Sequence, residues 1–182
     1  EAKRCGAIVR GMLQFSRQDP VEKVQEDLNT VIRRAIKAVE SYAVDRGAKF
    51  HTALAEEPIR LWMSPLEMEQ VVVNLLRNAI ESRPTDAAIS VSSAPPSESN
   101  PGVASFKISD NGAGIEENDR VRIFDPFFST KLNQGGTGLG LSVAHGIVSD
   151  HGGDISVATS PEKGTTITVA FDVETHAKNE AP

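Results

Sequence analysis

The sequence predicts an α/β fold of the α+β kind: a two-layer sandwich with a mixed, mostly antiparallel sheet packed on helices, preceded by an N-terminal helix. Segments with apolar residues at helical spacing are interspersed with short segments in which apolar and polar residues alternate, as in half-buried strands. Several strand-like segments are paired across turn residues, which favours antiparallel hairpins. The sequence contains two glycine-rich loops, and neither has the spacing and acidic residue of a βαβ dinucleotide-binding unit.

Length and composition limit the classes of function. A chain of 182 residues, 39% of them hydrophobic, can bury one sizeable core with a small helical appendage. The net charge of -6 argues against a nucleic-acid surface. No apolar run approaches the roughly 20 residues of a membrane helix, so we expect no membrane contact by this stretch. The lone cysteine, Cys5, excludes an intrachain disulfide. Together with the lack of a signal peptide, it fits a cytoplasmic location.

Residues 1–17 place apolar side chains at alternating spacings of three and four, the narrow seam of a coiled coil or helix bundle. Asp19-Pro20 ends this helix, because proline disfavours helix in the residue before it. An amphipathic helix docked on its own domain is the alternative. Since Glu1 already lies inside the helical pattern, we expect the chain to be a piece of a longer protein. The seam consists of Cys5, Ile8, Met12 and Phe15.

Residues 28–46 predict a helix that Asn29 or Thr30 caps and Gly47 ends. A second helix is expected at 139–149. Short strands are expected at 49–54, 59–63, 89–93, 106–110, 155–159 and 166–173, with a solvated loop at 94–102. We assign residues 21–174 to one domain and residues 175–182 to a flexible tail.

A long helix is predicted to begin after Ser64, with Glu67 closing a capping box. Residues 65–82 are apolar nearly all round, so this helix must be largely buried. It nevertheless carries one polar stripe, whose members are Gln70, Asn74, Asn78 and Glu81. Because buried amides need partners, something polar should meet the stripe. The amides of Asn74 and Asn78 suit a hard cation such as Mg²⁺ with a nucleotide, although local backbone could also satisfy them.

Two glycine-rich loops follow, with an aromatic segment between them. Asp110 precedes a turn opened by Gly112 and Gly114, where a carboxylate could accept the amino group of adenine; a plain hairpin turn is the alternative. Residues 135–141 run into a helix whose N–H groups and dipole favour phosphates, unless the loop is only a connector. Between them, residues 124–136 could form a mobile lid, from which Lys131 could reach the terminal phosphate. Phe124 is expected in the core, and Phe127 and Phe128 as anchors of the lid.

The asparagine pair, first glycine loop, phenylalanine segment and second glycine loop come in the order of the ATP-binding catalytic domain of sensor histidine kinases. From about Ser64 to Phe171 the chain resembles this branch of the GHKL superfamily, and the Phe15-Ser16-Arg17 ending resembles its dimerisation hairpin, so residues 1–20 read as the last helix of a truncated dimerisation domain. The resemblance implies a Bergerat-type ATP-binding fold that uses ATP and Mg²⁺. It implies Asn74, Asn78 and Lys131 as catalytic residues, with Asn78 the metal ligand. The nucleotide-binding residues would be Asp110, Gly112, Gly114, Ile115, Thr130, Gly136, Thr137, Gly138, Leu139, Gly140, Leu141 and Thr166.

This resemblance implies a kinase that gives the γ-phosphate of ATP to a histidine on its dimerisation domain, for relay to an aspartate of a response regulator. The full-length protein would be a homodimer, and it could be membrane-anchored. We expect none of His51, His145, His151 and His176 to be the acceptor, which would lie on the absent first helix of the hairpin. A GHKL-type ATP hydrolase is disfavoured because Asn74 stands where such enzymes carry a basic glutamate. A non-catalytic nucleotide-binding scaffold is a further alternative.

Overall fold

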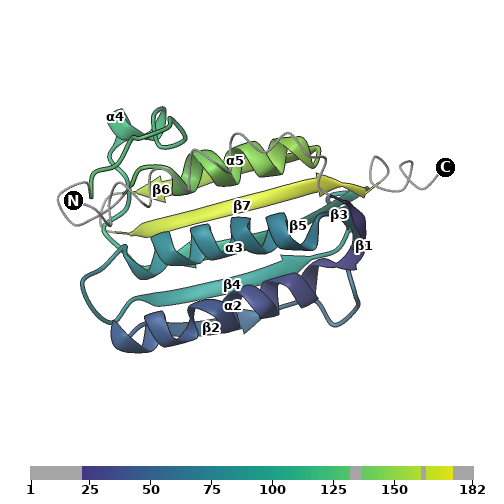
Figure 1. Cartoon of the computed structure of the whole chain (residues 1–182), viewed down its shortest axis with the longest axis horizontal. Coiled ribbons are helices and arrows are strands. Elements are labelled where there is room, and N and C mark those ends of the chain that lie inside the picture. The colour runs from purple at the N-terminus through teal and green to yellow at the C-terminus, as the bar shows by residue number, and fades with distance from the viewer. Residues whose placement is uncertain (1–21, 132–136, 161–162, 174–182) are drawn as a thin grey trace.

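The computed structural model describes residues 22–131, 137–160 and 163–173. Helices α2 (Leu28–Asp45), α3 (Pro65–Ile80) and α5 (Gly140–Asp150) lie side by side on one face of a sheet, with α3 in the middle (Figure 1). This arrangement confirms the predicted two-layer sandwich. The segments assigned to the dimerisation helix and to the tail lie outside the described residues.

The main sheet has five strands in the order β2-β4-β5-β7-β6. Only the pair of β2 and β4 is parallel, so the prediction of a mixed, mostly antiparallel sheet is confirmed. The strands are β2 (Lys49–Ala53), β4 (Ala88–Ala94), β5 (Val103–Asp110), β6 (Gly153–Ser160) and β7 (Gly164–Asp172).

Two elements were not predicted as such. Strand β1 (Val24–Asp27) pairs antiparallel with β3 (Arg60–Met63) in a separate small sheet. Helix α4 (Glu117–Arg120) is a single turn of polar residues, too short to show apolar periodicity. It lies at the edge of the sandwich where β5 ends and α5 begins (Figure 1).

The predicted cap of α2 is wrong. The carboxylate of Asp27 accepts the N–H groups of Asn29 and Thr30, so the cap lies two residues earlier than the first candidate. Asn29 is instead buried inside the helix, where its amide donates to the carbonyls of Ala55 and Glu57. A buried amide needs such partners, and they hold it in the helix rather than at its cap.

The predicted capping box of α3 forms only in part. Ser64 Oγ accepts the N–H of Glu67, as expected, at 3.3 Å. The N–H of Ser64, however, donates to His151 Nε2 and not to the Glu67 carboxylate. Leu66, expected to be buried, is 71% exposed because it lies outside the stripe that faces the sheet. That stripe consists of Met68, Val71, Val72, Leu75, Leu76, Ala79 and Ile80.

The core between the helices and the sheet determines where the strand ends point. On β5, Phe106 and Ile108 are buried under the helices, and the two-residue period places Asp110 on the same side. On β7, Val169 and Ile167 are buried in the same way, which places Thr165 beside Asp110. The helix-facing side of two adjacent strands therefore ends in polar residues at one edge of the sandwich.

Candidate nucleotide-binding site

Asp110 is the polar end of the core face of β5. Its Oδ1 accepts the N–H of Gly112 at 2.8 Å. Burial raises the pKa of the Asp110 carboxyl above its usual value. Groups that favour the ionised form oppose this shift: the N–H groups of Gly112 and Thr165, the Ser82 hydroxyl and the Lys131 ammonium. A further hydrogen-bond donor would stabilise the partly desolvated carboxylate.

Gly112 packs where no side chain fits. A Cβ atom at this position would overlap Ser82 and lie 2.7 Å from Asp110 Oδ1. Ser82 Oγ is buried beside the carboxylate without a hydrogen-bond partner among the described residues, and its dipole favours the charged form of Asp110. The sequence did not indicate Ser82, because it lies just beyond the polar stripe of α3.

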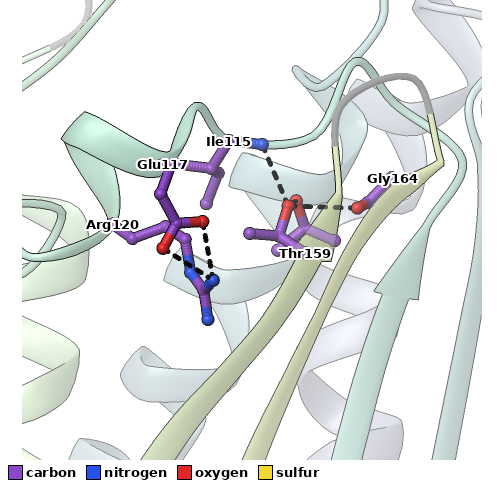
Figure 2. Close-up of polar contacts among 6 residues, drawn as sticks. Ile115, Glu117, Arg120, Thr159 and Gly164 are labelled. Carbon is purple, nitrogen blue, oxygen red and sulfur yellow. Dashed lines mark hydrogen bonds and ion pairs between the residues drawn. The ribbon is translucent and has the colours of Figure 1, made fainter.

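The first glycine loop is fastened to the hairpin of β6 and β7. The N–H of Ile115 donates to Thr159 Oγ1 at 2.9 Å, and the Thr159 hydroxyl donates to the carbonyl of Gly164 at 3.1 Å (Figure 2). Gly164 has a φ of +84°, and a Cβ atom there would overlap the Asp110 carbonyl. The loop that follows Asp110 is thus held against the start of β7. Thr159 could be predicted only as a strand residue.

The structure brings the asparagine pair to the start of α5. Asn74 Nδ2 donates to the carbonyl of Gly140 at 3.2 Å. A Cβ atom on Gly140 would lie 4.0 Å from Asn74 Cγ and 4.0 Å from Asn78 Nδ2. Both amides therefore face the N-terminus of an 11-residue helix, whose first N–H groups and dipole favour anions. The polar stripe continues to Glu81, which accepts the Tyr42 hydroxyl at 2.7 Å.

The phenylalanine segment contacts the second glycine loop through its backbone. The N–H of Phe127 donates to the carbonyl of Gly138 at 2.9 Å. Both residues have positive φ, 67° and 68°, and a Cβ atom on Gly138 would lie 2.6 Å from the Phe127 carbonyl oxygen. Phe124 packs against the core, as expected, and its ring lies 5.1 Å from that of His145 on α5. The two segments are therefore interlocked.

The family model described as "Histidine kinase-, DNA gyrase B-, and HSP90-like ATPase" matches residues 63–175. The chain belongs to this ATPase family. Membership implies that the domain binds ATP, and the matched stretch contains every element that converges on the candidate site.

Relatives of this ATPase domain are sensor histidine kinases. The whole chain is 34% identical over 179 residues to the sensor histidine kinase ZraS of Escherichia coli strain K12, and this alignment covers 98% of this chain and 37% of that protein. The catalytic domain of histidine kinase ThkA has a TM-score of 0.73 at 28% identity, covering 84% of this chain and 96% of the other. ThkA in complex with response regulator protein TrrA has a TM-score of 0.77 at 25% identity, covering 94% and 48%. The chain thus spans little more than a third of ZraS.

Thr166 lies on the opposite side of the sheet from Asp110. Its hydroxyl lies 2.8 Å from that of Ser109, and both residues alternate with core residues onto the side of the sheet away from the helices. The neighbouring Thr165 is buried on the Asp110 side. The alternation of Ile167 and Val169 with polar residues could have indicated this one-residue difference.

Lys131 lies near the Asp110 end of the site. Burial lowers the pKa of its ammonium group, while Glu81 and Asp110 raise it and Arg46 lowers it further. The charges that act on Lys131 are therefore those around Asp110, and its contact with a terminal phosphate stays a prediction.

The remaining predicted positions are spread along the two loops. Thr130 is exposed, Leu139 is buried and Leu141 packs against the core. Thr137 Oγ1 accepts the N–H of Leu139 at 3.4 Å, and Gly114 has a φ of 78°. Gly136 lies outside the described residues.

Protein side chains alone do not form a metal site in the described part of the chain, where no group of three or more His, Cys, Asp or Glu could hold an ion. The amide oxygens of Asn74 and Asn78 fit a cation that takes its other ligands from phosphates and water. Among the described residues, no helix is long and apolar enough to cross a membrane.

Proposed function

We propose that this chain is the catalytic domain of a sensor histidine kinase, which binds Mg-ATP and donates the γ-phosphoryl group to a histidine on a separate dimerisation domain. The observation that carries the proposal is the convergence of Asn74 and Asn78 on Gly140 at the start of α5. Paired amides beside a free helix N-terminus suit a triphosphate with its cation better than any neutral ligand.

Asp110 would select the base. Its ionised carboxylate accepts the 6-amino group of adenine, whereas guanine has a carbonyl at that position and would be repelled. The partly buried carboxylate and the close packing at Gly112 support this role. Among the nucleotide-binding residues, Thr165 would take the place of the predicted Thr166, because Thr165 lies on the same side of the sheet as Asp110.

The phosphates would lie between α3 and the second glycine loop. The free N–H groups at the start of α5 would hold phosphate oxygens, and Asn78 would ligate Mg²⁺ with Asn74 beside it. When bound, Mg²⁺ neutralises charge on the β- and γ-phosphates. The protein contributes chiefly position and charge. In the transfer, a bond forms between the γ-phosphorus and an imidazole nitrogen while the bond from that phosphorus to the β–γ bridging oxygen breaks. ADP leaves with the electron pair of the broken bond, and the imidazole loses its N–H proton to water.

The partners follow from the relatives. ThkA forms a complex with a response regulator, and we propose a receiver domain of that kind as the destination of the phosphoryl group. The acceptor histidine would belong to a homodimeric helical hairpin in the full-length protein. Hydrolysis is the weaker alternative, since Asn74 cannot serve as a general base for water.

Calorimetric titration with ATP and GTP, with and without Mg²⁺, tests the binding step. We expect the wild-type chain to bind Mg-ATP and to discriminate against GTP. Asn78→Ala should remove most of the Mg²⁺ dependence and leave thermal stability nearly unchanged. Asn100→Ala, which removes an amide from the exposed loop between β4 and β5, is the matched control and should bind like wild type. Equal affinity for ATP and GTP, or Mg²⁺ dependence unchanged in Asn78→Ala, would contradict the proposal.

A further inference from the structure

A buried histidine joins the two helices that form the candidate phosphate site. His151 directly follows α5, and its side chain is fully buried. Its Nδ1 lies 2.8 Å from the carbonyl oxygen of Ile147, and its Nε2 lies 3.0 Å from the backbone nitrogen of Ser64. A carbonyl can only accept and a backbone N–H can only donate. The ring must therefore be neutral, with its hydrogen on Nδ1.

The contact with Ser64 connects opposite ends of the two helices. Ser64 caps the start of α3, whereas His151 follows the end of α5. At the other end of the pair, Asn74 of α3 donates to Gly140 at the start of α5. The helices are thus antiparallel and linked at both ends of α5, and the candidate phosphate site lies at the Gly140 end.

A second hydrogen-bond acceptor, the Glu67 carboxylate, lies near the His151 ring. Glu67 Oε2 lies 3.9 Å from His151 Nε2, near hydrogen-bond distance but not bonded to it. If Nε2 gained a proton, it could no longer accept the N–H of Ser64 but could donate to the Glu67 carboxylate. Among the described residues, Asp150 on α5 and Lys23 also lie at this end, and the Lys23 ammonium donates to the Asp150 carbonyl at 2.7 Å. Burial raises the pKa of Glu67, Lys23 lowers it and Asp150 raises it.

We propose that neutral His151 is a positioning residue for ATP binding, because it fixes the start of α3 against α5 and thereby sets the asparagine pair opposite the second glycine loop. This proposal rests on the proposed function. Protonation of the ring moves Nε2 from Ser64 to Glu67 and releases the start of α3. The affinity for Mg-ATP should therefore fall when acid protonates the ring.

Two substitutions separate the two hydrogen bonds of the ring. Gln places a neutral amide near the position of Nε2, so His151→Gln keeps an acceptor for Ser64 and cannot titrate. Asn places its amide near Nδ1, so His151→Asn keeps the bond to Ile147 and loses Ser64. We expect His151→Asn to bind Mg-ATP about three- to tenfold more weakly at neutral pH, the effect of one lost buried hydrogen bond, and His151→Gln to bind nearly like wild type.

The decisive quantity is the ratio of the wild-type Kd to the Kd of His151→Gln, measured by calorimetry from pH 5.5 to pH 8. Titration of Asp110 and of the nucleotide affects both proteins alike and cancels in the ratio. We expect the ratio to rise about three- to tenfold as the pH falls. His51→Gln, the same change on the exposed β2, should follow the wild-type profile. A ratio independent of pH, or normal affinity of His151→Asn, would overturn the proposal.

Nuclear magnetic resonance of the wild-type chain keeps the test decisive if the variants unfold. The ring nitrogens of His151 report its protonation directly, and the amide resonances of Ser64 and Gly140 report the two ends of the helix pair. We expect both amides to shift with the same midpoint as the ring. Resonances of Gly140 that ignore the titration of His151 would overturn the proposal. A wild-type chain that binds no Mg-ATP at any pH would instead contradict the proposed function.

Discussion

At the residue scale, Asp110 shows how burial prepares a side chain for one ligand. The carboxylate lies at the end of a core-facing strand, so it is partly removed from water. One of its oxygens is engaged by the N–H of Gly112, and close packing against Ser82 leaves no room to rearrange that turn. A residue whose orientation is fixed before binding loses little entropy when a ligand arrives.

Asp110→Asn tests the base contact. The substitution replaces an acceptor with an amide that can present a donor to the adenine amino group. We expect ATP affinity to fall by about 1–3 kcal/mol, the effect of a mismatched buried hydrogen bond. Calorimetry measures the loss, and the melting temperature checks that the fold persists. The same carboxylate-to-amide change in exposed Asp154→Asn, on β6, is the control. An Asp110→Asn chain that still prefers ATP over GTP would remove Asp110 from the site.

The raised pKa of Asp110 predicts two opposite responses to acid. ATP affinity should fall as the pH drops through the raised pKa, because the protonated carboxyl is a poorer acceptor. The folded chain holds this proton more tightly than the unfolded chain. Between the usual aspartate value and the raised pKa, nucleotide-free wild type should therefore gain stability relative to Asp110→Asn as the pH falls. Thermal melts measure the stability of both proteins, and calorimetry measures their ATP affinity. If wild type and Asp110→Asn changed with pH in the same way in either measurement, the raised pKa could not be assigned to Asp110.

At the element scale, the sequence predicts most helices and strands because local rules decide them. The Ser64 cap and the buried stripe of α3 follow from residues a few positions apart. The failures come from long-range contacts. His151 takes the N–H that the capping box assigned to Glu67, and buried carbonyls hold Asn29 inside α2. Neither partner lies within reach of a local pattern.

The true cap of α2 yields a stability prediction. The Asp27 carboxylate accepts the N–H groups of Asn29 and Thr30, the Thr30 hydroxyl and the N–H of Ile59. Asp27→Ala removes all four bonds and should destabilise the fold by about 2 kcal/mol, the upper range for a cap. Denaturant unfolding measures the loss. Exposed Asp45→Ala, at the other end of the helix, is the control and should change stability by less than about 0.5 kcal/mol.

Alanine substitutions of three glycines near α5 distinguish effects on the fold from effects on ligand binding. Gly138→Ala should destabilise the interlocked loops, since its φ is +68° and a Cβ atom would lie 2.6 Å from the Phe127 oxygen. Gly140→Ala meets nothing closer than 4.0 Å, so the fold should persist while the methyl group obstructs the phosphates between Asn74 and Asn78. Gly146 lies within α5, and a Cβ atom there would meet nothing within 4 Å. Gly146→Ala should therefore stabilise the helix by about 0.5–1 kcal/mol.

Thermal melts and ATP titrations of the three variants check this order. The expected result is loss of stability for Gly138→Ala, loss of affinity alone for Gly140→Ala and neither for Gly146→Ala. Normal ATP affinity of Gly140→Ala would place the phosphates elsewhere.

At the scale of the whole molecule, the order of motifs predicts a nucleotide site, but only the fold determines which side chains meet. Asn74 and Gly140 are 66 positions apart and touch because α3 and α5 pack antiparallel. Thr165, and not Thr166, lies on the side of Asp110 because the register between β5 and β7 determines which threonine faces the helices. The alternation of Ile167 and Val169 with polar residues indicates which threonine shares their face, but the sequence does not show that the end of β5 pairs beside it.

The arrangement of the whole chain predicts where phosphate can be transferred. His51 lies on the exposed β2, His151 is fully buried, and His145 contacts Phe124; His176 lies outside the described residues. None of the three described histidines stands on a separate helix that could approach a γ-phosphate between α3 and α5.

Incubation with γ-labelled ATP should therefore leave this chain unlabelled. Addition of a dimerisation hairpin that carries an acceptor histidine should give label on the hairpin alone, and the Asn78→Ala chain should give none. Label on His51, His145, His151 or His176 of the isolated chain would contradict the prediction that the acceptor histidine lies on a separate hairpin. Rapid ATP turnover without a hairpin would move the chain to the hydrolase class, in which water takes the place of the imidazole.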